Sequence, residues 1–213
     1  MLRAAIAALL TALPLAAVAQ QDDAGLAKFS VDGVTLIYDT ETTVEGEEAE
    51  ITYEDIDRLR ALLRDNDGIK VLELNSTGGG VFASEEMARI VIDFGLDTVV
   101  SGSCVSSCVN VFLAGTSRRM LLGSKIGFHR RQWSAAAIED YYESQRESRG
   151  WDTPYEFASW VYEDTQAETY KHLAYMISRG VDPAFAIRTK AVSNDDEWYP
   201  SRLELFQAGV LTE

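Results

Sequence analysis

The sequence predicts an α/β fold in which strands and helices alternate as far as His129 and helices alone follow. Residues 69–74 form an apolar run of strand type, and apolar residues at helical spacing then continue to Gly95. The β-type run 98–101 and a second short helical stretch repeat the alternation. Strand, helix, strand and helix in succession indicate parallel βαβ units around one sheet.

The first 19 residues have the three parts of a signal peptide. Arg3 supplies a positive charge, residues 4–15 are apolar but too few to span a bilayer, and residues 17–19 form a small-residue cleavage site. We therefore expect one mature domain at 20–213 that is periplasmic or secreted, without a membrane span after removal of the leader. The compartment would permit disulfides. A retained membrane anchor is the alternative.

The composition is that of an acidic globular protein. Of the 213 residues, 46% are hydrophobic, and the formal net charge is −15. Loss of Arg3 with the leader leaves 18 basic and 34 acidic side chains, a net charge of −16. This charge argues against nucleic acid or an anionic membrane as a partner. Two histidines exclude a multi-histidine metal site and two cysteines alone do not make a zinc site, so we expect no metal and no other cofactor.

A hairpin and a helix are expected near the N-terminus of the mature domain. Asp32-Gly33 separates two β-type runs, which is a hairpin signal. The acidic residues 42–50 are expected to form a solvated loop. Thr52 and Asp55 resemble a capping box that opens a helix. The apolar face of this helix carries Ile56, Leu59 and Leu63.

Three consecutive glycines, residues 78–80, follow the predicted strand and precede a helix. Glycine lets the backbone approach a ligand closely, although a flexible turn or a phosphate-binding nest would use the same run. The segment is not a P-loop, because no Gly-Lys-Ser/Thr follows at the required spacing. Ser84 is expected to cap the helix that ends at Gly95.

Ser106 lies where the predicted strand that starts at Thr98 passes through a tight turn into a helix. Backbone N–H groups at a helix start are unpaired, and the helix dipole favours negative charge there. A second β-type run ends at His129. A hydroxyl at a helix start and an imidazole from a neighbouring strand can together carry out nucleophilic acyl transfer. Taken alone, each feature is common, since serine turns and strand-end histidines are mostly structural.

Two long amphipathic helices, residues 135–149 and 154–179, and two shorter ones are expected in the C-terminal part. Their many aromatic side chains could form core, line an apolar substrate groove or make a subunit interface. The basic pairs 118–119 and 130–131 are expected to be solvated strand ends. Steering of an acidic substrate is the alternative for these pairs.

Four short motifs stand in a fixed order along the chain. They are Leu74-Asn75-Ser76-Thr77-Gly78-Gly79, Gly102-Ser103-Cys104-Val105-Ser106-Ser107, Phe112-Leu113-Ala114-Gly115 and Ile126-Gly127-Phe128-His129. Together they resemble the proteolytic subunit of Clp protease, and more closely its exported relatives in the Clp/crotonase superfamily, which carry a Cys-x-Ser-x-Cys nucleophile turn. The resemblance covers residues 34–129 and returns at 195–212. It implies an α/β spiral of ββα units with a helical C-terminal portion.

The resemblance also implies roles for individual residues. Ser106 takes the nucleophile position and His129 the general-base position. The N–H groups of Gly79 and Ser107 take the oxyanion-hole positions, where two fixed donors meet an oxygen as it becomes charged. For the acid that orients the imidazole we favour Asp196, and the adjacent Asp195 and Glu197 are the alternatives.

The two cysteines, Cys104 and Cys108, flank the proposed nucleophile turn. A disulfide between them would clamp Ser106, and two small buried thiols packed under the turn are the alternative. A cysteine nucleophile is less favoured, because His129 faces Ser106 in the register of the family.

These features predict an exported serine hydrolase, a peptidase that works without ATP-driven unfolding, with a peptide or protein as substrate. The chain departs from the Clp subunit at Thr77, where that family usually has proline, and in its cysteines and leader. A non-catalytic peptide-binding module is the first alternative, and a crotonase-like acyl-thioester enzyme is the second. Association into a homo-oligomer through the C-terminal helices is also expected from the resemblance.

Overall fold

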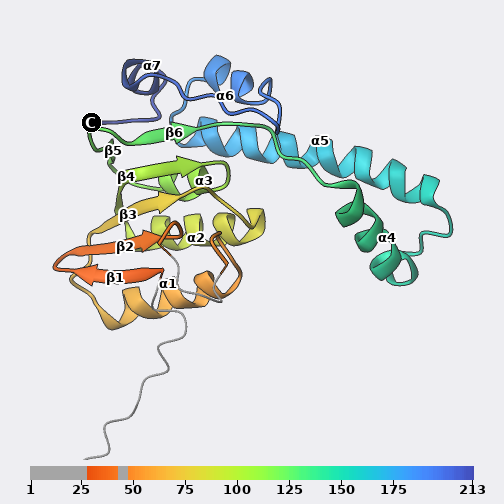
Figure 1. The fold of residues 1–213 in the computed structure, drawn as a ribbon, viewed down its shortest axis with the longest axis horizontal. Coiled ribbons are helices and arrows are strands. Elements are labelled where there is room, and N and C mark those ends of the chain that lie inside the picture. The colour runs from red at the N-terminus through yellow and green to blue at the C-terminus, as the bar shows by residue number, and fades with distance from the viewer. Residues whose placement is uncertain (1–27, 43–47) are drawn as a thin grey trace, which may run out of the picture.

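The computed structural model describes residues 28–42 and 48–213, which form a sheet with helices beside it (Figure 1). The predicted signal peptide lies outside the described residues, and so does most of the loop predicted at 42–50. The α/β prediction is confirmed, because the described chain has seven helices and a sheet of mostly parallel strands.

The sheet has six strands in the spatial order β1-β2-β3-β4-β5, with β6 pairing further along β4. Only β1 and β2 pair antiparallel, as the hairpin predicted at Asp32-Gly33; the other pairs are parallel. Parallel strands need crossovers, and α1, α2 and α3 supply them. The strands are β1 Phe29–Asp32, β2 Thr35–Asp39, β3 Val71–Ser76, β4 Asp97–Val105, β5 Arg118–Met120 and β6 Lys125–Gly127.

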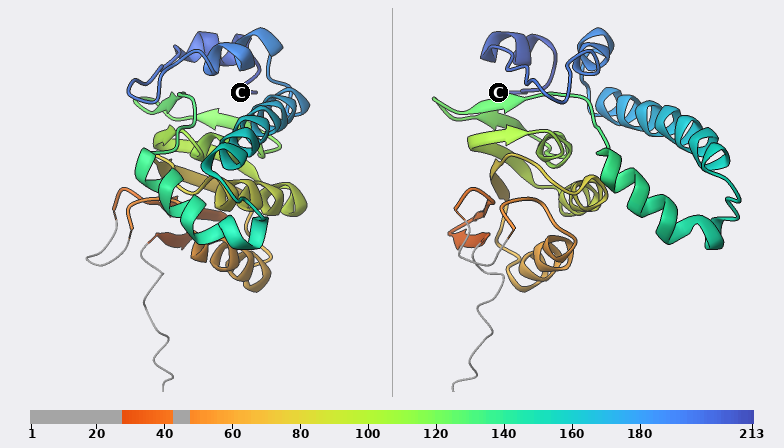
Figure 2. Two further views of the ribbon diagram at one scale, coloured as in Figure 1. Left: turned by 90° about the vertical axis from the view of Figure 1, so that its right-hand side faces the viewer. Right: turned by 45° about the vertical axis from the view of Figure 1, so that its right-hand side comes forward.

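The first three helices lie along one side of the sheet (Figure 2). They are α1 Glu54–Asp65, α2 Val81–Phe94 and α3 Cys108–Leu113. Each turns its apolar stripe inward, and the predicted face of α1 is buried as expected. Gly95 closes α2 in the left-handed conformation at φ 64°, as predicted for its C-terminus. The main core therefore lies between this helical layer and the sheet.

Two predicted helix caps are wrong in detail. Helix α2 begins at Val81, and the buried Ser84 hydroxyl donates to the Val81 carbonyl at 2.7 Å instead of capping. Thr52 supplies only half of a capping box, because its N–H donates to Asp55 at 2.8 Å but its hydroxyl caps nothing. Buried Asp55 also accepts from Lys28 and Tyr38, and burial beside this carboxyl raises the pKa of Tyr38. Ser84 thus bonds within its own helix, and Asp55 serves partners that are distant in sequence.

The C-terminal helices are α4 Ala135–Arg149, α5 Pro154–Ser178, α6 Pro183–Thr189 and α7 Arg202–Gln207. Helix α5 begins with the predicted Pro154 and a capping box at Thr153. Figures 1 and 2 show α4 and the start of α5 projecting from the body as an arm. A separate aromatic cluster holds this arm together, with Tyr142, Trp151 and Phe157 at its centre.

Arg118 corrects the expectation of a solvated basic pair. Its guanidinium is buried and donates to the carbonyls of Val210 at 3.0 Å and Gly209 at 2.8 Å, while Arg119 is exposed. The Arg118 side chain therefore fixes the C-terminal segment to β5 through hydrogen bonds to backbone carbonyls. No helix among the described residues is both long and apolar enough to cross a membrane.

Candidate active site

The turn that carries Ser106 begins later than predicted. Strand β4 continues beyond Ser101 to Val105, because Ser103 to Val105 pair with β6 and the β3 pairing resumes after a register shift. Ser106 then has φ 57°, and it is the only non-glycine residue of the described chain with a positive φ. Such backbone strain at a strand-to-helix junction is typical of nucleophile turns.

The glycine run lies directly against this turn. A Cβ added to Gly78 would lie 3.0 Å from the Cβ of Ser106 and 3.2 Å from the nitrogen of Ser107. The Ser107 hydroxyl donates to the Gly79 carbonyl at 3.1 Å and joins the two segments. Residues 75–79 and 102–107, which are separate in the sequence, therefore form one surface.

Gly79 is held on its other side by Ile51. The N–H of Ile51 donates to the carbonyl of Gly78 at 2.8 Å. The N–H of Gly80 donates to the carbonyl of Ile51, also at 2.8 Å. A Cβ at Gly79 would lie 2.4 Å from the Ile51 nitrogen, and its φ of 142° is one that other residues rarely adopt. Only glycine fits between Ile51 and the serine turn.

The two expected oxyanion donors are unpaired in the part of the chain that the structure describes. Neither the N–H of Gly79 nor that of Ser107 donates to an acceptor there, whereas the N–H of Ser106 donates to Gly127 at 3.2 Å. The Ser107 N–H lies at the start of α3, where N–H groups have no partner within the helix, whereas an unpaired N–H in a loop, such as that of Gly79, is uncommon when buried. The two N–H groups lie on segments in contact, so they are available to an oxygen bound beside Ser106.

His129 follows β6 and is half-buried. The preceding residue, Phe128, exchanges two hydrogen bonds of 3.0 Å with Trp198, which fixes the end of the strand. The His129 Nδ1 lies 3.0 Å from the Arg130 carbonyl. A carbonyl only accepts, so this bond requires the proton on Nδ1 and leaves Nε2 as a free acceptor. No hydrogen bond joins His129 to Ser106 in this state.

No carboxylate of the described structure forms a hydrogen bond or ion pair with His129. Asp196 is exposed and accepts from the N–H of Glu197 at 2.8 Å. The Glu197 carboxylate accepts from the Tyr199 hydroxyl instead. Asp195 is also exposed, and its N–H donates to Ser193. The structure thus brings the serine turn and the glycine loop together but leaves the imidazole without an acidic partner.

Cys104 and Cys108 form a disulfide in the structure, with an S–S distance of 2.09 Å and a Cα–Cα distance of 5.3 Å. Both residues are fully buried. One lies near the end of β4 and the other opens α3, so the bond spans the turn that carries Ser106. Of the two states expected from the sequence, the structure contains the clamped turn.

Replacing both cysteines by alanine is expected to destabilise the fold by about 2 kcal/mol, because the closed loop is short and little chain entropy is removed from the unfolded state. Urea unfolding of the double variant beside the parent measures this difference. Intact mass of the parent, with and without alkylation, is the control for the bond. Free thiols in the folded parent would contradict the prediction.

The sequence analysis missed a cluster of charged residues around Arg131, which follows His129 by two positions. Arg131, expected to be solvated, pairs with Glu85 of α2 at 3.1 Å and Glu168 of α5 at 3.2 Å. Next to it, Lys190 lies 2.6 Å from the His172 Nδ1. Glu168 and His172 stand four apart on α5, so they share a helix face; this spacing was the available signal.

This environment opposes positive charge on His172. Burial, followed by Lys190 and Arg131, lowers its pKa to about 3. Burial and Arg131 also lower the pKa of Lys190 to about 8, so Lys190 remains a cation at neutral pH and donates to the imidazole. His172 is therefore neutral over the physiological range.

Stability is expected to fall as the pH drops below about 6.5, since unfolded His172 binds a proton there and the folded residue does not. The contribution is complete above pH 6.5 and is lost progressively toward pH 3. Between pH 6.5 and 4.5 the loss of unfolding free energy from this residue is about 2.7 kcal/mol. Urea unfolding at pH 7 and 4.5 should show a smaller decrease for His172→Gln than for the parent. Equal decreases in the two proteins would refute the role of His172.

The fold and this turn define an α/β protein with a serine at the strand-to-helix junction, and its fold is similar to that of ClpP structures. Among solved structures, ClpP1 from Listeria monocytogenes matches with a TM-score of 0.53 at 16% identity, covering 77% of this chain and 85% of that chain. A mutant of that ClpP1 matches over the same shares with a TM-score of 0.52 at 16% identity.

No protein-family model and no curated protein matches the sequence. At 16% identity the likeness to ClpP1 shows the fold alone. Within residues 28–42 and 48–213, no group of three or more His, Cys, Asp or Glu side chains is placed to hold a metal ion.

Proposed function

We propose that the protein is an exported serine hydrolase, a peptidase that forms an acyl-enzyme on Ser106. The observation that carries the proposal is the left-handed backbone of Ser106 at the end of β4, in contact with the glycine loop. A serine that served only as a turn residue would need neither this strain nor a glycine loop with an unpaired N–H beside it.

In the proposed reaction, the Ser106 hydroxyl attacks the scissile carbonyl and its proton passes to the His129 Nε2. The N–H groups of Gly79 and Ser107 stabilise the oxyanion. His129 then protonates the leaving amine, and water hydrolyses the acyl-enzyme by the reverse sequence of proton transfers. The Arg130 carbonyl supports this role, because it keeps the imidazole proton on Nδ1.

The acid of the triad is proposed to be Asp196, with Asp195 and Glu197 as the alternatives. None of the three contacts His129 in the present state, so the assignment requires a rearrangement of their exposed turn when substrate binds. Catalytic hydrogen bonds often tighten only in the substrate complex. The rates at which a fluorophosphonate labels Asp195→Asn, Asp196→Asn and Glu197→Gln would identify the acid of the triad.

A fluorophosphonate probe tests the nucleophile directly, with covalent labelling read by intact mass. We expect one probe per parent molecule and none on Ser106→Ala or His129→Ala, since both an activated hydroxyl and a base are required. Ser103→Ala, on the same strand, is the matched control and should label like the parent. Equal labelling of the parent and Ser106→Ala would refute Ser106 as the nucleophile.

A non-catalytic peptide-binding module is the second candidate. It is favoured by the absence of a hydrogen bond from His129 to Ser106 or to any carboxylate of the described chain. No labelling of a folded parent, together with binding of peptides, would support this candidate over the hydrolase.

We also propose a periplasmic or secreted location and a peptide or protein substrate that reaches the site without an ATPase. A buried disulfide supports the location, because such bonds persist in oxidising compartments. The projecting α4–α5 arm supports association of copies through these helices. Light scattering coupled to size exclusion would give the mass of the mature protein in solution.

A further inference from the structure

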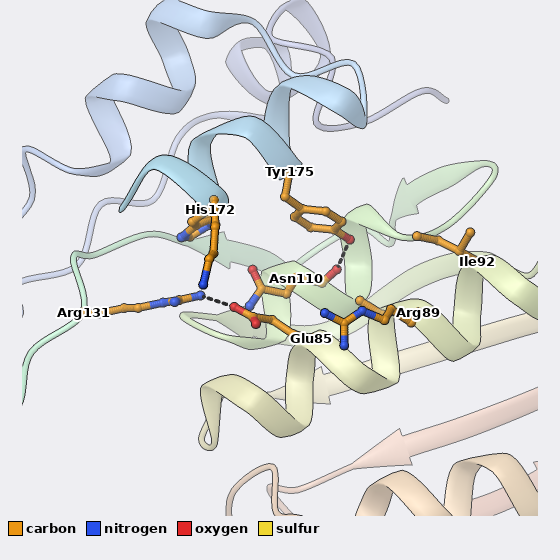
Figure 3. A pocket seen from close by; sticks show the side chains of 9 residues that line it. Glu85, Arg89, Ile92, Asn110, Arg131, His172 and Tyr175 are labelled. Atoms are coloured by element: carbon orange, nitrogen blue, oxygen red, sulfur yellow. Dashed lines mark hydrogen bonds and ion pairs between the residues drawn. The ribbon is translucent and has the colours of Figure 1, made fainter. Parts of the chain in front are cut away.

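A pocket of about 230 Å³ lies between α2, the end of α5 and the buried helix α3 (Figure 3). It contains none of the residues assigned to catalysis above. Its walls combine polar, charged and apolar groups, so it is more than a gap in the core. The side chains used below are Glu85, Arg89, Asn110, Arg131, Lys171 and His172.

Asn110 supplies a buried acceptor that has no donor. The residue is 2% exposed, and its Oδ1 has no hydrogen-bond partner in the described structure. The orientation of the amide follows from its neighbours: Nδ2 donates to the Ser84 hydroxyl at 2.9 Å, and that hydroxyl donates to Val81. Ser84 therefore accepts from Asn110, and Oδ1 is the atom left over. Buried acceptors are normally paired, so this one indicates a missing donor.

Positive charge prevails around the same pocket, although the whole chain carries a net charge of −15. Arg89, Arg131 and Lys171 line it together with Glu85, and these cations pair with three carboxylates, Glu85, Glu86 and Glu168. Lys190, beside His172, is the fourth cation and forms no ion pair with a described carboxylate, so the cluster has one positive charge in excess. His172 adds a neutral imidazole whose Nδ1 accepts from Lys190, which leaves the ring proton on Nε2. This excess of one cation, beside a neutral imidazole, favours an anionic ligand.

We propose that this pocket binds an acylamino carboxylate, the group found at the C-terminus of a peptide and in an N-acyl amino acid. The amide N–H of the ligand donates to the Asn110 Oδ1. Its carboxylate is held by the exposed cations of α2 and α5, where it replaces Glu86 on Arg89 or Glu168 on Lys171. Ala88 and Ile92 provide the apolar wall against which the terminal side chain packs.

The position of Asn110 connects the pocket to the serine turn. Asn110 lies in α3, and its N–H donates at 3.0 Å to the carbonyl of Ser107, which follows the candidate nucleophile. Tyr175 of α5 donates to the Asn110 carbonyl at 2.6 Å. A ligand here would therefore stiffen the helix that positions Ser106. This consequence rests on the proposed hydrolase function, whereas the binding itself does not.

Isothermal titration of Ser106→Ala with acetyl-Ala-Ala tests the binding without turnover. We expect acetyl-Ala-Ala amide to bind at least tenfold more weakly, because it lacks the carboxylate. Inorganic phosphate is the third probe. Phosphate binding as tight as that of acetyl-Ala-Ala would overturn the proposal, since an unspecific anion site would then suffice. No binding of acetyl-Ala-Ala would also overturn it.

Asn110→Ala and Arg89→Gln, each added to Ser106→Ala, are expected to weaken acetyl-Ala-Ala at least tenfold. Arg64→Gln is the matched control, an exposed arginine of α1 outside the pocket. The Arg89 side chain is largely exposed, so its variant keeps the test decisive if Asn110→Ala fails to fold. Unchanged affinity in Arg89→Gln would refute the assignment. Fluorophosphonate labelling of the parent decides the hydrolase proposal separately.

Discussion

Gly79→Ala is expected to lower fluorophosphonate labelling by about 10²–10³-fold, the usual effect of losing one oxyanion donor. The methyl group would lie 2.4 Å from the Ile51 nitrogen, on backbone that cannot move without breaking its hydrogen bonds to Gly78 and Gly80. The loop must therefore shift away from the serine turn. The positive φ adds strain, and we expect a loss of about 2–4 kcal/mol in unfolding free energy.

Gly68→Ala is the matched control for this change. A Cβ at Gly68 has nothing within 4 Å, so we expect neither stability nor labelling to change measurably. Labelling rates are to be compared at a temperature where both variants are folded by circular dichroism. Parent-like labelling of folded Gly79→Ala would show that its N–H does not face the reacting oxygen.

Arg118→Met is expected to be the most destabilising change away from the site, by about 3–4 kcal/mol. Arg118 alone donates its side chain to the Val210 and Gly209 carbonyls, whereas its acceptors Leu113 and Gly115 are also served by Arg179. Methionine keeps the apolar stem and removes every donor, so the buried carbonyl of Val210 and the partly buried carbonyl of Gly209 lose their partner. For a chain of this size the loss corresponds to a decrease of roughly 10 °C in melting temperature.

Arg119→Met, at the neighbouring exposed position, controls for the loss of one positive charge and should melt within about 2 °C of the parent, as surface substitutions usually do. Differential scanning calorimetry of both variants gives the comparison. Equal melting of the two variants would mean that the backbone contacts of Arg118 contribute little to stability.

Locally encoded elements were predicted well. Helix α4 occupies the expected residues 135–149, and α5 starts at the expected Pro154, because helical periodicity and capping residues lie within a few positions of one another. The hairpin of β1 and β2 has the same explanation, since Asp32-Gly33 and the flanking strands form one contiguous signal.

Predictions that depended on hydrogen-bond or strand-pairing partners distant in the sequence were less successful. Ser84 has the chemistry of a cap but bonds within its helix and accepts from Asn110, which lies 26 positions away. Strand β4 was predicted too short, because Ser103 to Val105 are strand through pairing with β6 and, at Cys104, with β3. Local propensity carries no information about such partners.

For the candidate site, the sequence by itself determined the order of the motifs and the residue types, with Ser106 at a strand-to-helix turn and Gly79 in a glycine run. These depend on φ preferences and on the absence of a side chain, which are properties of single residues. The tertiary structure alone decided that Arg131 is paired between α2 and α5. It also decided that, among the described residues, no donor bonds to the Asn110 Oδ1 and no carboxylate bonds to His129. Hydrogen bonds and ion pairs between distant segments depend on how the helices pack against the sheet, and that packing is a property of the whole chain.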